Sequence, residues 1–246
     1  MVKDVEALSA RPIWSELQLS LTHVSQLRII GLFEDLDDSD LKRVAASCSI
    51  RTHERHAQII DEQDRTSDVF FILEGVVRIN SYSPTGREVV FSEVGPGGMF
   101  GEFAAIDELP RSATILALSD CLLARMSAVA FMDLLRANST VSIQLIEFLV
   151  SKIRRMSERV FEVSALAVRE RVRRELLRLA ADGKVTGQGV IIQPTPTHYE
   201  FAARIGTHRE AVTREFNRLE SERIIELGRR RIRIVNLRQL QQSQKI

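Results

Sequence analysis

Residues 99–114 read MFGEFAAIDELPRSAT, and the fold prediction starts from this stretch. Gly101 lets the backbone approach a bound group closely, because glycine has no Cβ. A short helix from Phe103 would point free backbone N–H groups at an anion, and Arg111 would add a planar fork of donors. Phosphate is the anion that this set of donors fits best.

Glu102 lies inside the same stretch and carries the wrong charge for an anion site. Its carboxylate would repel phosphate unless it accepts hydrogen bonds from a neutral donor, such as a ribose hydroxyl. From the residues alone, two interpretations stay open. One is a phosphoribose site, and the other is a structural ion pair between Arg111 and Glu102.

Short apolar runs separated by turn residues surround this stretch, from about residue 49 to residue 127. Glycine and proline clusters, such as residues 95–98, supply the conformations that tight turns need. Strands of this length and spacing predict a small β-barrel or sandwich. The clearest apolar runs are residues 69–73, 76–79, 89–91 and 114–124.

A long helical region follows, because no Gly or Pro occurs between Asn138-Ser139, a predicted helix N-cap, and Gly183. Within it, apolar residues alternate spacings of three and four, which is a heptad pattern. A parallel pair of helices from two chains is favoured over an ordinary amphipathic helix. Residues 164–166 are a predicted hinge before a second helix. The heptad residues are Ile146, Leu149, Ile153, Met156, Val160, Val163 and Ala167.

Charge is distributed unevenly along the chain, although its formal net charge is only +1. Residues 166–246 carry 17 Lys/Arg and 9 Asp/Glu, a net charge of +8, whereas residues 1–165 carry 17 and 24, a net charge of −7. A basic segment suits an anionic macromolecule, because cationic side chains release the counterions of phosphates. A solvated basic face without a partner is the alternative.

Residues 197–216 predict a helix-turn-helix, with two helices joined at Gly206 and Thr207 capping the second. Arg209, Glu210 and Arg214 would together face a DNA major groove, where Arg forks onto guanine and Glu accepts from cytosine. Intrahelical ion pairs on a solvated face are the alternative. Residues 224–235 alternate around a Gly-Arg turn and predict a β-hairpin wing, whose arginines would contact phosphate.

Several other classes of protein receive little support. The chain has two cysteines, Cys48 and Cys121, too far apart in sequence for a zinc or iron–sulfur cluster within one chain. Five histidines lack a metal-binding spacing, so metal or haem sensing is a minor alternative. Clustered carboxylates at residues 61–64 have no partner base, which argues against an enzyme. Neither a bilayer-spanning apolar run nor a secretory signal is present, so a cytoplasmic location is expected.

The Phe-Gly-Glu motif at residues 100–102, followed by Arg-Ser-Ala-Thr at residues 111–114, resembles the phosphate-binding cassette of cyclic nucleotide-binding domains. Residues 208–214 are similar to the recognition helix of the bacterial cyclic-AMP receptor proteins, in the CRP/FNR family. The resemblance covers roughly residues 31–237. It implies an α+β fold with a jelly-roll-type β-barrel, a long dimerisation helix and a winged helix-turn-helix.

The resemblance also assigns roles to the cassette residues. Glu102 would bond the ribose 2′-hydroxyl, and Arg111 and Ser112 would bond the cyclic phosphate. In the dimer helix, Met156 and Ser157 stand where the family has a Thr-Ser pair that contacts the purine. This difference leaves the choice of purine open, with cyclic AMP favoured and cyclic GMP as the alternative. The expected ligand-binding residues are Gly101, Glu102, Phe103, Ala104, Arg111, Ser112, Ala113, Met156 and Ser157.

For the basic segment, the resemblance implies that Arg209 and Arg214 read guanines and that Glu210 reads a cytosine, in palindromic TGTGA-like sites. His208 replaces a serine of the family, so one phosphate contact differs. The expected DNA-binding residues are Thr197, Thr207, His208, Arg209, Glu210, Thr213, Arg214, Arg229 and Arg230.

The predicted organisation is a helical extension at residues 1–30, a cyclic nucleotide-binding domain at 31–137, a dimerisation helix at 138–164 and a DNA-binding domain at 165–246. The predicted protein is a homodimeric transcription activator that binds a cyclic nucleotide, double-stranded DNA and RNA polymerase, and that needs no catalytic cofactor, metal or membrane. Two alternatives stay open. One is a regulator of this superfamily with a ligand-independent or different trigger, and the other is an interaction protein whose basic domain does not bind DNA.

Overall fold

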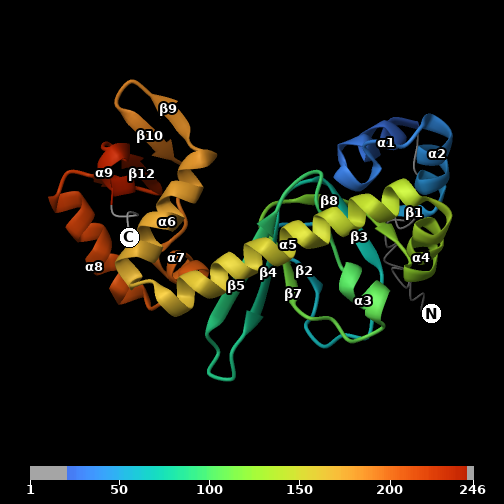
Figure 1. Ribbon diagram of the computed structural model, residues 1–246, viewed down its shortest axis with the longest axis horizontal. Coiled ribbons are helices and arrows are strands. Elements are labelled where there is room, and N and C mark those ends of the chain that lie inside the picture. Colours follow the sequence, from blue (N-terminus) through green and yellow to red (C-terminus); the bar gives the residue numbers. More distant parts are fainter. Residues whose placement is uncertain (1–20, 243–246) are drawn as a thin grey trace, which may run out of the picture. The chain divides into compact units, whose positions relative to one another are not determined.

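The computed structural model describes residues 21–242, so most of the predicted helical extension at residues 1–30 lies outside the described residues. The chain divides into two compact units (Figure 1). Within the described residues, the first consists of residues 21–80 and 92–147, and the second of residues 81–91 and 148–242.

The first unit is built around two four-stranded sheets, of order β1-β8-β3-β6 and β2-β7-β4-β5. Buried side chains from both sheets, including Phe70, Val77, Ile115 and Leu123, form one core between them. The expected α+β fold is confirmed, although the two sheets remain separate in place of one closed barrel. The strands are β1 (Cys48–His53), β2 (Gln58–Ile60), β3 (Val69–Glu74), β4 (Val77–Tyr82), β5 (Glu88–Val94), β6 (Met99–Phe100), β7 (Thr114–Ala117) and β8 (Cys121–Met126).

Helices cover one face of the first sheet. The ring of Phe71 on β3 lies 4.8 Å from Phe33 and 6.5 Å from Phe131, measured between ring centroids, and all three rings are fully buried. Successive residues of a strand face opposite sides, so Phe70 and Phe71 serve two different cores. The helical segments are α1 (Leu21–Gln26), η1 (Leu27–Ile29), η2 (Gly31–Phe33), α2 (Asp38–Ala46), α3 (Glu102–Asp107) and α4 (Ala128–Ala137).

The long helix α5 (Ser139–Ala165) begins where the sequence predicted. The Asn138 side chain accepts a hydrogen bond from the Val141 N–H at 3.1 Å, as an N-cap residue does. The helix ends at Ala165, so the first two residues of the predicted hinge at 164–166 are helical. The next helix, α6 (Val168–Ala181), starts after Leu166 and Ala167.

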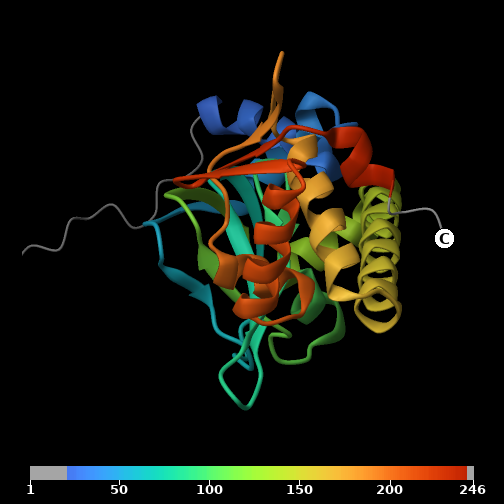
Figure 2. The ribbon, with the colours of Figure 1, turned by 90° about the vertical axis from the view of Figure 1, so that its left-hand side faces the viewer.

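The second unit contains a helix-turn-helix and a four-stranded sheet of order β11-β12-β10-β9. Figure 2 turns this unit toward the viewer, with α8 in orange-red and α6 in orange. Phe201, Phe216 and Val172 form the centre of its core. The hairpin of β9 and β10 was not predicted from the sequence. The remaining elements are β9 (Lys184–Thr186), β10 (Gly189–Ile192), α7 (His198–Ile205), α8 (Arg209–Ser221), β11 (Ile225–Gly228), β12 (Arg231–Ile234) and α9 (Leu237–Gln241).

Between residues 21 and 242, no helix combines the length and the apolar content that crossing a membrane requires. In the same part of the chain, no group of three or more His, Cys, Asp or Glu side chains is arranged to hold a metal ion.

Candidate functional sites

The backbone of the predicted cassette bends at Gly101. This residue is the N-cap of α3 and has φ +89° and ψ 0°, a left-handed conformation that favours glycine. A Cβ at this position would lie 2.6 Å from the carbonyl oxygen of Asp68 and 2.8 Å from Nη1 of Arg111. Glycine is therefore required here both by conformation and by space. The helix begins at Glu102, one residue earlier than predicted.

Arg111 is the central side chain of the cassette, and only 3% of its surface is exposed. Its guanidinium donates to Thr66 Oγ1 at 3.0 Å, to the Gly101 carbonyl at 2.9 Å and to the Asp68 carbonyl at 2.9 Å. A guanidinium has five N–H groups. Three of them make these contacts and fix the plane of the group, and the other two remain for a ligand. Burial lowers the pKa of Arg111, an effect that the carboxylates of Asp68, Asp64 and Glu102 oppose.

Glu102 lies beside this guanidinium and is 1% exposed. The structure thus brings Gly101, Glu102 and Arg111 together, as the sequence predicted. Their neighbours differ in exposure: Phe103 and Ser112 are exposed, whereas Ala104 and Ala113 are buried. Any ligand contact of Ala113 would therefore come from its backbone.

Met156 and Ser157 lie on α5 and are both exposed. They belong to the second compact unit, whereas the cassette belongs to the first. Their contribution to a ligand site therefore stays a prediction.

The helix-turn-helix forms in the second unit from α7 and α8. Thr197 is the N-cap of α7, where its hydroxyl accepts from the Glu200 N–H and the Glu200 carboxylate accepts from the Thr197 N–H. This reciprocal arrangement satisfies two N–H groups of the first turn. Gly206 ends α7 with φ +65°, in the left-handed conformation that the sequence predicted.

The prediction that Thr207 caps the second helix is wrong. The helix α8 begins at Arg209 with His208 as its N-cap, and Thr207 is buried, its N–H donating to the Ala202 carbonyl at 3.0 Å. Thr207 follows the left-handed turn at Gly206, and its hydrogen bond belongs to the end of α7. The next residue, His208, is therefore the N-cap of α8.

The side chains predicted to read bases lie near the start of α8. Arg209, Glu210 and Arg214 are exposed, while Val212 and Phe216 on the opposite side of the helix are fully buried. This division of the faces leaves the first turns of α8 free to enter a groove.

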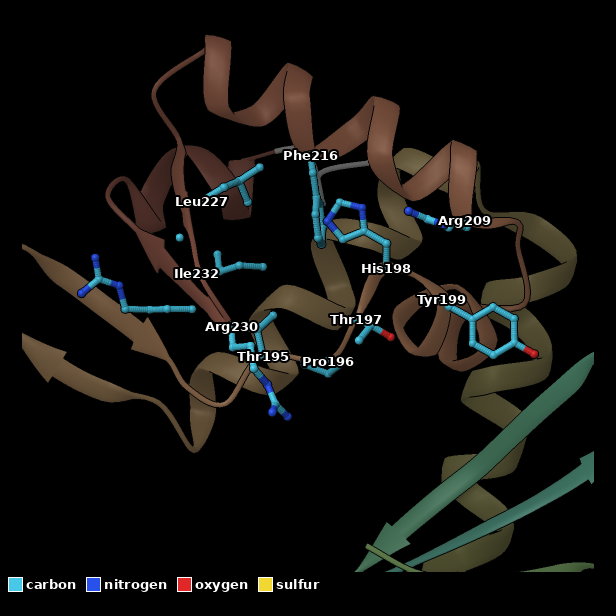
Figure 3. Close-up of a pocket in the computed structure, with 12 residues that line it drawn as sticks. Thr195, Pro196, Thr197, His198, Tyr199, Arg209, Phe216, Leu227, Arg230 and Ile232 are labelled. Carbon is cyan, nitrogen blue, oxygen red and sulfur yellow. The ribbon is translucent and has the colours of Figure 1, made fainter. Parts of the chain in front are cut away.

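A groove of about 470 Å³ runs between α7, α8 and the wing (Figure 3). The hairpin of β11 and β12 forms the predicted wing, with the exposed Arg229 and Arg230 at its turn. Of the described residues that line the groove, three are arginines and one is a histidine, and none carries a carboxylate. Its lining residues include Thr197, His198, Tyr199, Arg209, Arg230 and Arg231.

Two further residues at these sites, His198 and Thr66, carry no signal in the sequence. His198 Nδ1 lies 2.8 Å from the Thr213 hydroxyl, a contact between two helices that no short motif predicts. Thr66 precedes β3 in a loop, and its role as an acceptor for Arg111 follows only from the fold.

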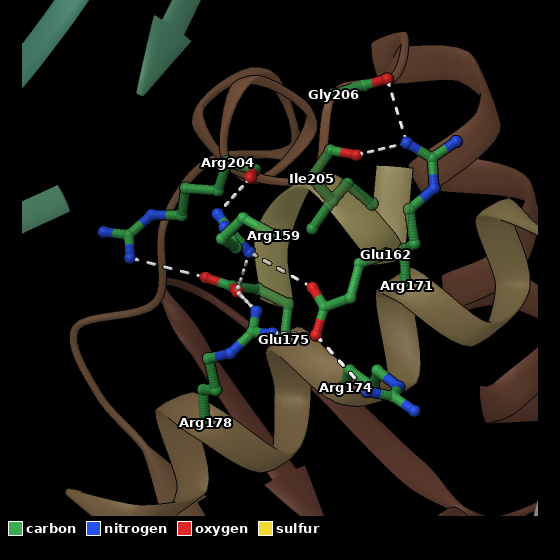
Figure 4. Close-up of polar contacts among 9 residues, drawn as sticks. All are labelled: Arg159, Glu162, Arg171, Arg174, Glu175, Arg178, Arg204, Ile205 and Gly206. Carbon is green, nitrogen blue, oxygen red and sulfur yellow. Dashed lines mark hydrogen bonds and ion pairs between the residues drawn. The ribbon is translucent and has the colours of Figure 1, made fainter. Parts of the chain in front are cut away.

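A buried cluster of charges joins the end of α5 to α6 and α7 (Figure 4). Glu162 and Glu175 are each about 4% exposed, and each contacts three arginines. The nearest contacts of Glu175 are with Arg178 at 2.7 Å and Arg159 at 3.3 Å. Arg159 also donates to the Arg204 carbonyl at the end of α7. The full set of arginines is Arg159, Arg174, Arg178 and Arg204.

Arg171 adds a second tie within this unit. Only 9% of Arg171 is exposed, and its guanidinium donates to the carbonyls of Ile205 at 2.5 Å and Gly206 at 3.1 Å. These carbonyls lie at the end of α7, where no further helical turn can satisfy them. The helix-turn-helix is therefore fixed both to α6 and to the last turns of α5.

A β-sandwich unit with this cassette, followed by a long helix and a winged helix-turn-helix, has the architecture of a ligand-responsive DNA-binding regulator. Residues 50–138 match the family described as cyclic nucleotide-binding domain, and residues 170–243 match the Crp-like helix-turn-helix domain. The chain belongs to the cyclic-AMP receptor protein (CRP/FNR) family of transcription regulators.

Two relatives and one solved structure illustrate the match. The chain is 28% identical over 189 residues to the cAMP-activated global transcriptional regulator Vfr of Pseudomonas aeruginosa, covering 75% of this chain and 88% of Vfr. It is 28% identical over 197 residues to the cyclic AMP receptor protein of Thermus thermophilus, covering 80% and 88% of the two chains. The fold also matches the c-di-GMP responsive global regulator CLP of Xanthomonas campestris, with a TM-score of 0.70, 19% identity and coverage of 80% and 99%.

We expect the charge cluster to stabilise the second unit. Glu175→Ala leaves three arginines without their shared carboxylate, and we expect the free energy of unfolding to fall by about 2–3 kcal/mol, a value reduced because the arginines are partly exposed. Chemical denaturation followed by circular dichroism measures the change.

The matched control is Glu158→Ala, which removes an exposed carboxylate from the same end of α5. We expect it to change stability by less than about 0.5 kcal/mol. Equal effects of the two substitutions would contradict a stabilising role for the cluster.

Proposed function

We propose that this protein is a homodimeric transcription activator that binds a cyclic nucleotide at residues 101–113 and palindromic TGTGA-like DNA through α8. The observation that carries this proposal is the buried Arg111, held by three acceptors beside Gly101 and Glu102. Its two remaining N–H groups suit a cyclic phosphate, because a planar fork bonds two phosphate oxygens at once.

The cassette explains both halves of a nucleotide ligand. Arg111 and Ser112 bond the cyclic phosphate, together with the backbone of Gly101, Phe103 and Ala104. The buried Glu102 accepts from the ribose 2′-hydroxyl, a neutral donor that offsets the burial of the carboxylate. Cyclic AMP is the favoured ligand, because the relatives Vfr and the Thermus thermophilus receptor are cAMP proteins by name. Cyclic GMP is the second candidate, since Met156 and Ser157 replace the purine-contacting pair of the family.

The dimer forms along the exposed apolar side chains of α5. A single chain leaves these residues between 51% and 66% exposed, which is unusual for a row of large aliphatic side chains on one helix. A second copy of the same helix, packed in parallel, would cover them in knobs-into-holes contacts. The residues are Ile146, Ile153, Met156, Val160 and Val163.

Regulation follows from a shift between two states. Ligand binding changes the register of the two α5 helices, and the segment at Leu166 and Ala167 transmits this change to the DNA-binding units. The ligand selects the state in which the two recognition helices are one DNA turn apart, ~34 Å, so that both enter the major groove. RNA polymerase then binds the DNA-bound dimer.

Ligand binding depends on the planar guanidinium of Arg111 and its paired N–H donors. We expect Arg111→Lys to weaken cyclic nucleotide binding by about 100-fold, because hydrogen bonds to charged groups contribute about 1.5–3 kcal/mol each. Arg111→Ala should abolish stimulation of DNA binding by the ligand and leave the weak basal affinity. Calorimetry with cyclic AMP and cyclic GMP measures the first effect, and a DNA-binding assay the second.

The matched control is Arg136→Lys, at an exposed position of α4, which should leave affinity unchanged. Equal stimulation of the Arg111→Ala variant would refute the ligand assignment. If calorimetry of the wild-type protein detects no heat of binding with either nucleotide, the ligand assignment is wrong. The regulator would then have a ligand-independent or different trigger.

Base reading depends on α8. We expect Arg209→Ala to cost about 1–3 kcal/mol and to relax preference at one base position, because a forked arginine distinguishes guanine from the other bases. Titration of TGTGA palindromes with single-base changes measures this. Arg169→Ala, at an exposed position on α6, is the control and should keep the base preference. An unchanged preference in the Arg209 variant would remove this residue as a base reader.

Assembly depends on the α5 seam. We expect Ile153→Glu to convert the dimer to a monomer at micromolar concentration, because two carboxylates would be buried against each other. Sedimentation velocity measures the mass. Arg155→Glu lies outside the seam and should leave the dimer intact. A wild-type protein that remains a monomer even when saturated with nucleotide would overturn the proposed mechanism.

A further inference from the structure

Among residues 21–242, His198 is the imidazole that lines the groove between α7, α8 and the wing (Figure 3). It is the first residue of α7 and is half-buried. Its ring meets Phe216 edge-on, with 5.0 Å between centroids and an angle of 90° between planes. Phe216 lies on α8 and is fully buried in the core, so this contact fixes the orientation of the imidazole on the outer surface of the core.

A chain of hydrogen bonds defines which ring nitrogen carries the proton. The Thr213 hydroxyl donates its proton to the Arg209 carbonyl at 3.0 Å. It also lies 2.8 Å from His198 Nδ1. A hydroxyl has only one proton, so we assign Nδ1 as the donor in this contact while that proton is used at the Arg209 carbonyl. The neutral ring is therefore protonated at Nδ1, and Nε2 is the nitrogen that takes up a further proton. Protonation leaves the link to α8 intact.

The charged groups that line this groove come from α8 and the wing. Arg209 is on α8, and Arg230 and Arg231 are on the wing. On α7 itself lie Tyr199, an uncharged phenol at neutral pH, and Glu200, whose carboxylate accepts the N–H and hydroxyl of Thr197. Burial and, secondarily, the Arg209 cation lower the pKa of His198 from its usual 6.5. In the free protein the ring is therefore largely neutral at pH 7.

A DNA phosphate in this groove would reverse the electrostatic balance. The anion offsets the arginines and favours the charged imidazolium, because an opposite charge nearby raises the pKa of a base. We propose that His198 takes up a proton at Nε2 when the groove receives a DNA phosphate, so that DNA affinity falls as the pH rises through neutrality. This inference rests on the proposed function, since it assumes that α8 and the wing bind DNA.

The direction of the pH dependence follows from linkage. The complex holds more protons than its separated components, so mass action strengthens binding as the pH falls. The effect is confined to the interval between the pKa of the free ring, which is below 6.5, and that of the ring in the complex. Each unit of difference between these two pKa values corresponds to about a tenfold change in affinity per subunit.

The test measures affinity for one TGTGA palindrome by fluorescence anisotropy, with saturating cyclic AMP and constant salt, from about pH 5.5 to about pH 8. His198→Asn keeps a donor where Nδ1 stands and removes the titration. We expect the wild-type affinity to fall by at least about tenfold over this range and that of the variant to change far less. His56→Asn, which removes an exposed histidine outside the DNA-binding unit, is the matched control and should keep the wild-type slope.

A second variant distinguishes loss of the titration from misfolding of the His198→Asn protein. His198→Lys carries a permanent positive charge in this range, so we expect tight binding without the pH slope, whereas a misfolded protein would bind weakly at every pH. Calorimetry of the wild-type protein in two buffers with different ionisation enthalpies should show uptake of up to one proton per subunit on DNA binding.

Two failures are distinguishable. If the wild-type protein binds the palindrome and His198→Asn keeps the full pH slope, the proton-uptake proposal is overturned and the proposed function stands. If the wild-type protein binds no DNA at any pH, the proposed function falls, and this inference falls with it.

Discussion

An arginine can be buried only where its donors find acceptors, and the first unit meets this requirement at Arg111. The loop before β3 supplies two acceptors, and the carbonyl of Gly101 supplies the third. That third contact requires a residue without a Cβ, so Gly101 and Arg111 depend on each other. The same contacts also orient the two remaining N–H groups of the guanidinium.

The second unit solves the opposite problem, because it buries carboxylates. Glu162 and Glu175 are shared among four arginines from α5, α6 and α7. A buried charge that lost its partners would be costly, so these elements hold together. The result is a stable platform for α8. On its outer face the cations Arg209, Arg230 and Arg231 line a groove without carboxylates, which suits an anionic polymer.

Much of this architecture is predictable from local sequence signals. Turn glycines and short apolar runs predicted the strands, the absence of Gly and Pro predicted α5, and Gly206 predicted the bend between α7 and α8. Errors arose where local signals compete. Thr207 and His208 are both polar residues after a glycine, and only the packing of α7 determines that Thr207 is buried and His208 becomes the N-cap.

The sequence by itself determined the order of the elements apart from the hairpin of β9 and β10, the cassette residues Gly101, Glu102 and Arg111, and the exposed positions on α8 that we propose as base readers. These features depend on short-range spacing, which the chain records directly. The tertiary structure alone decided which groups meet across elements: Thr66 with Arg111, His198 with Thr213, and Glu175 with Arg204. Such contacts join residues 15 to 45 positions apart in the sequence, and their energies depend on burial, which only the packed fold defines.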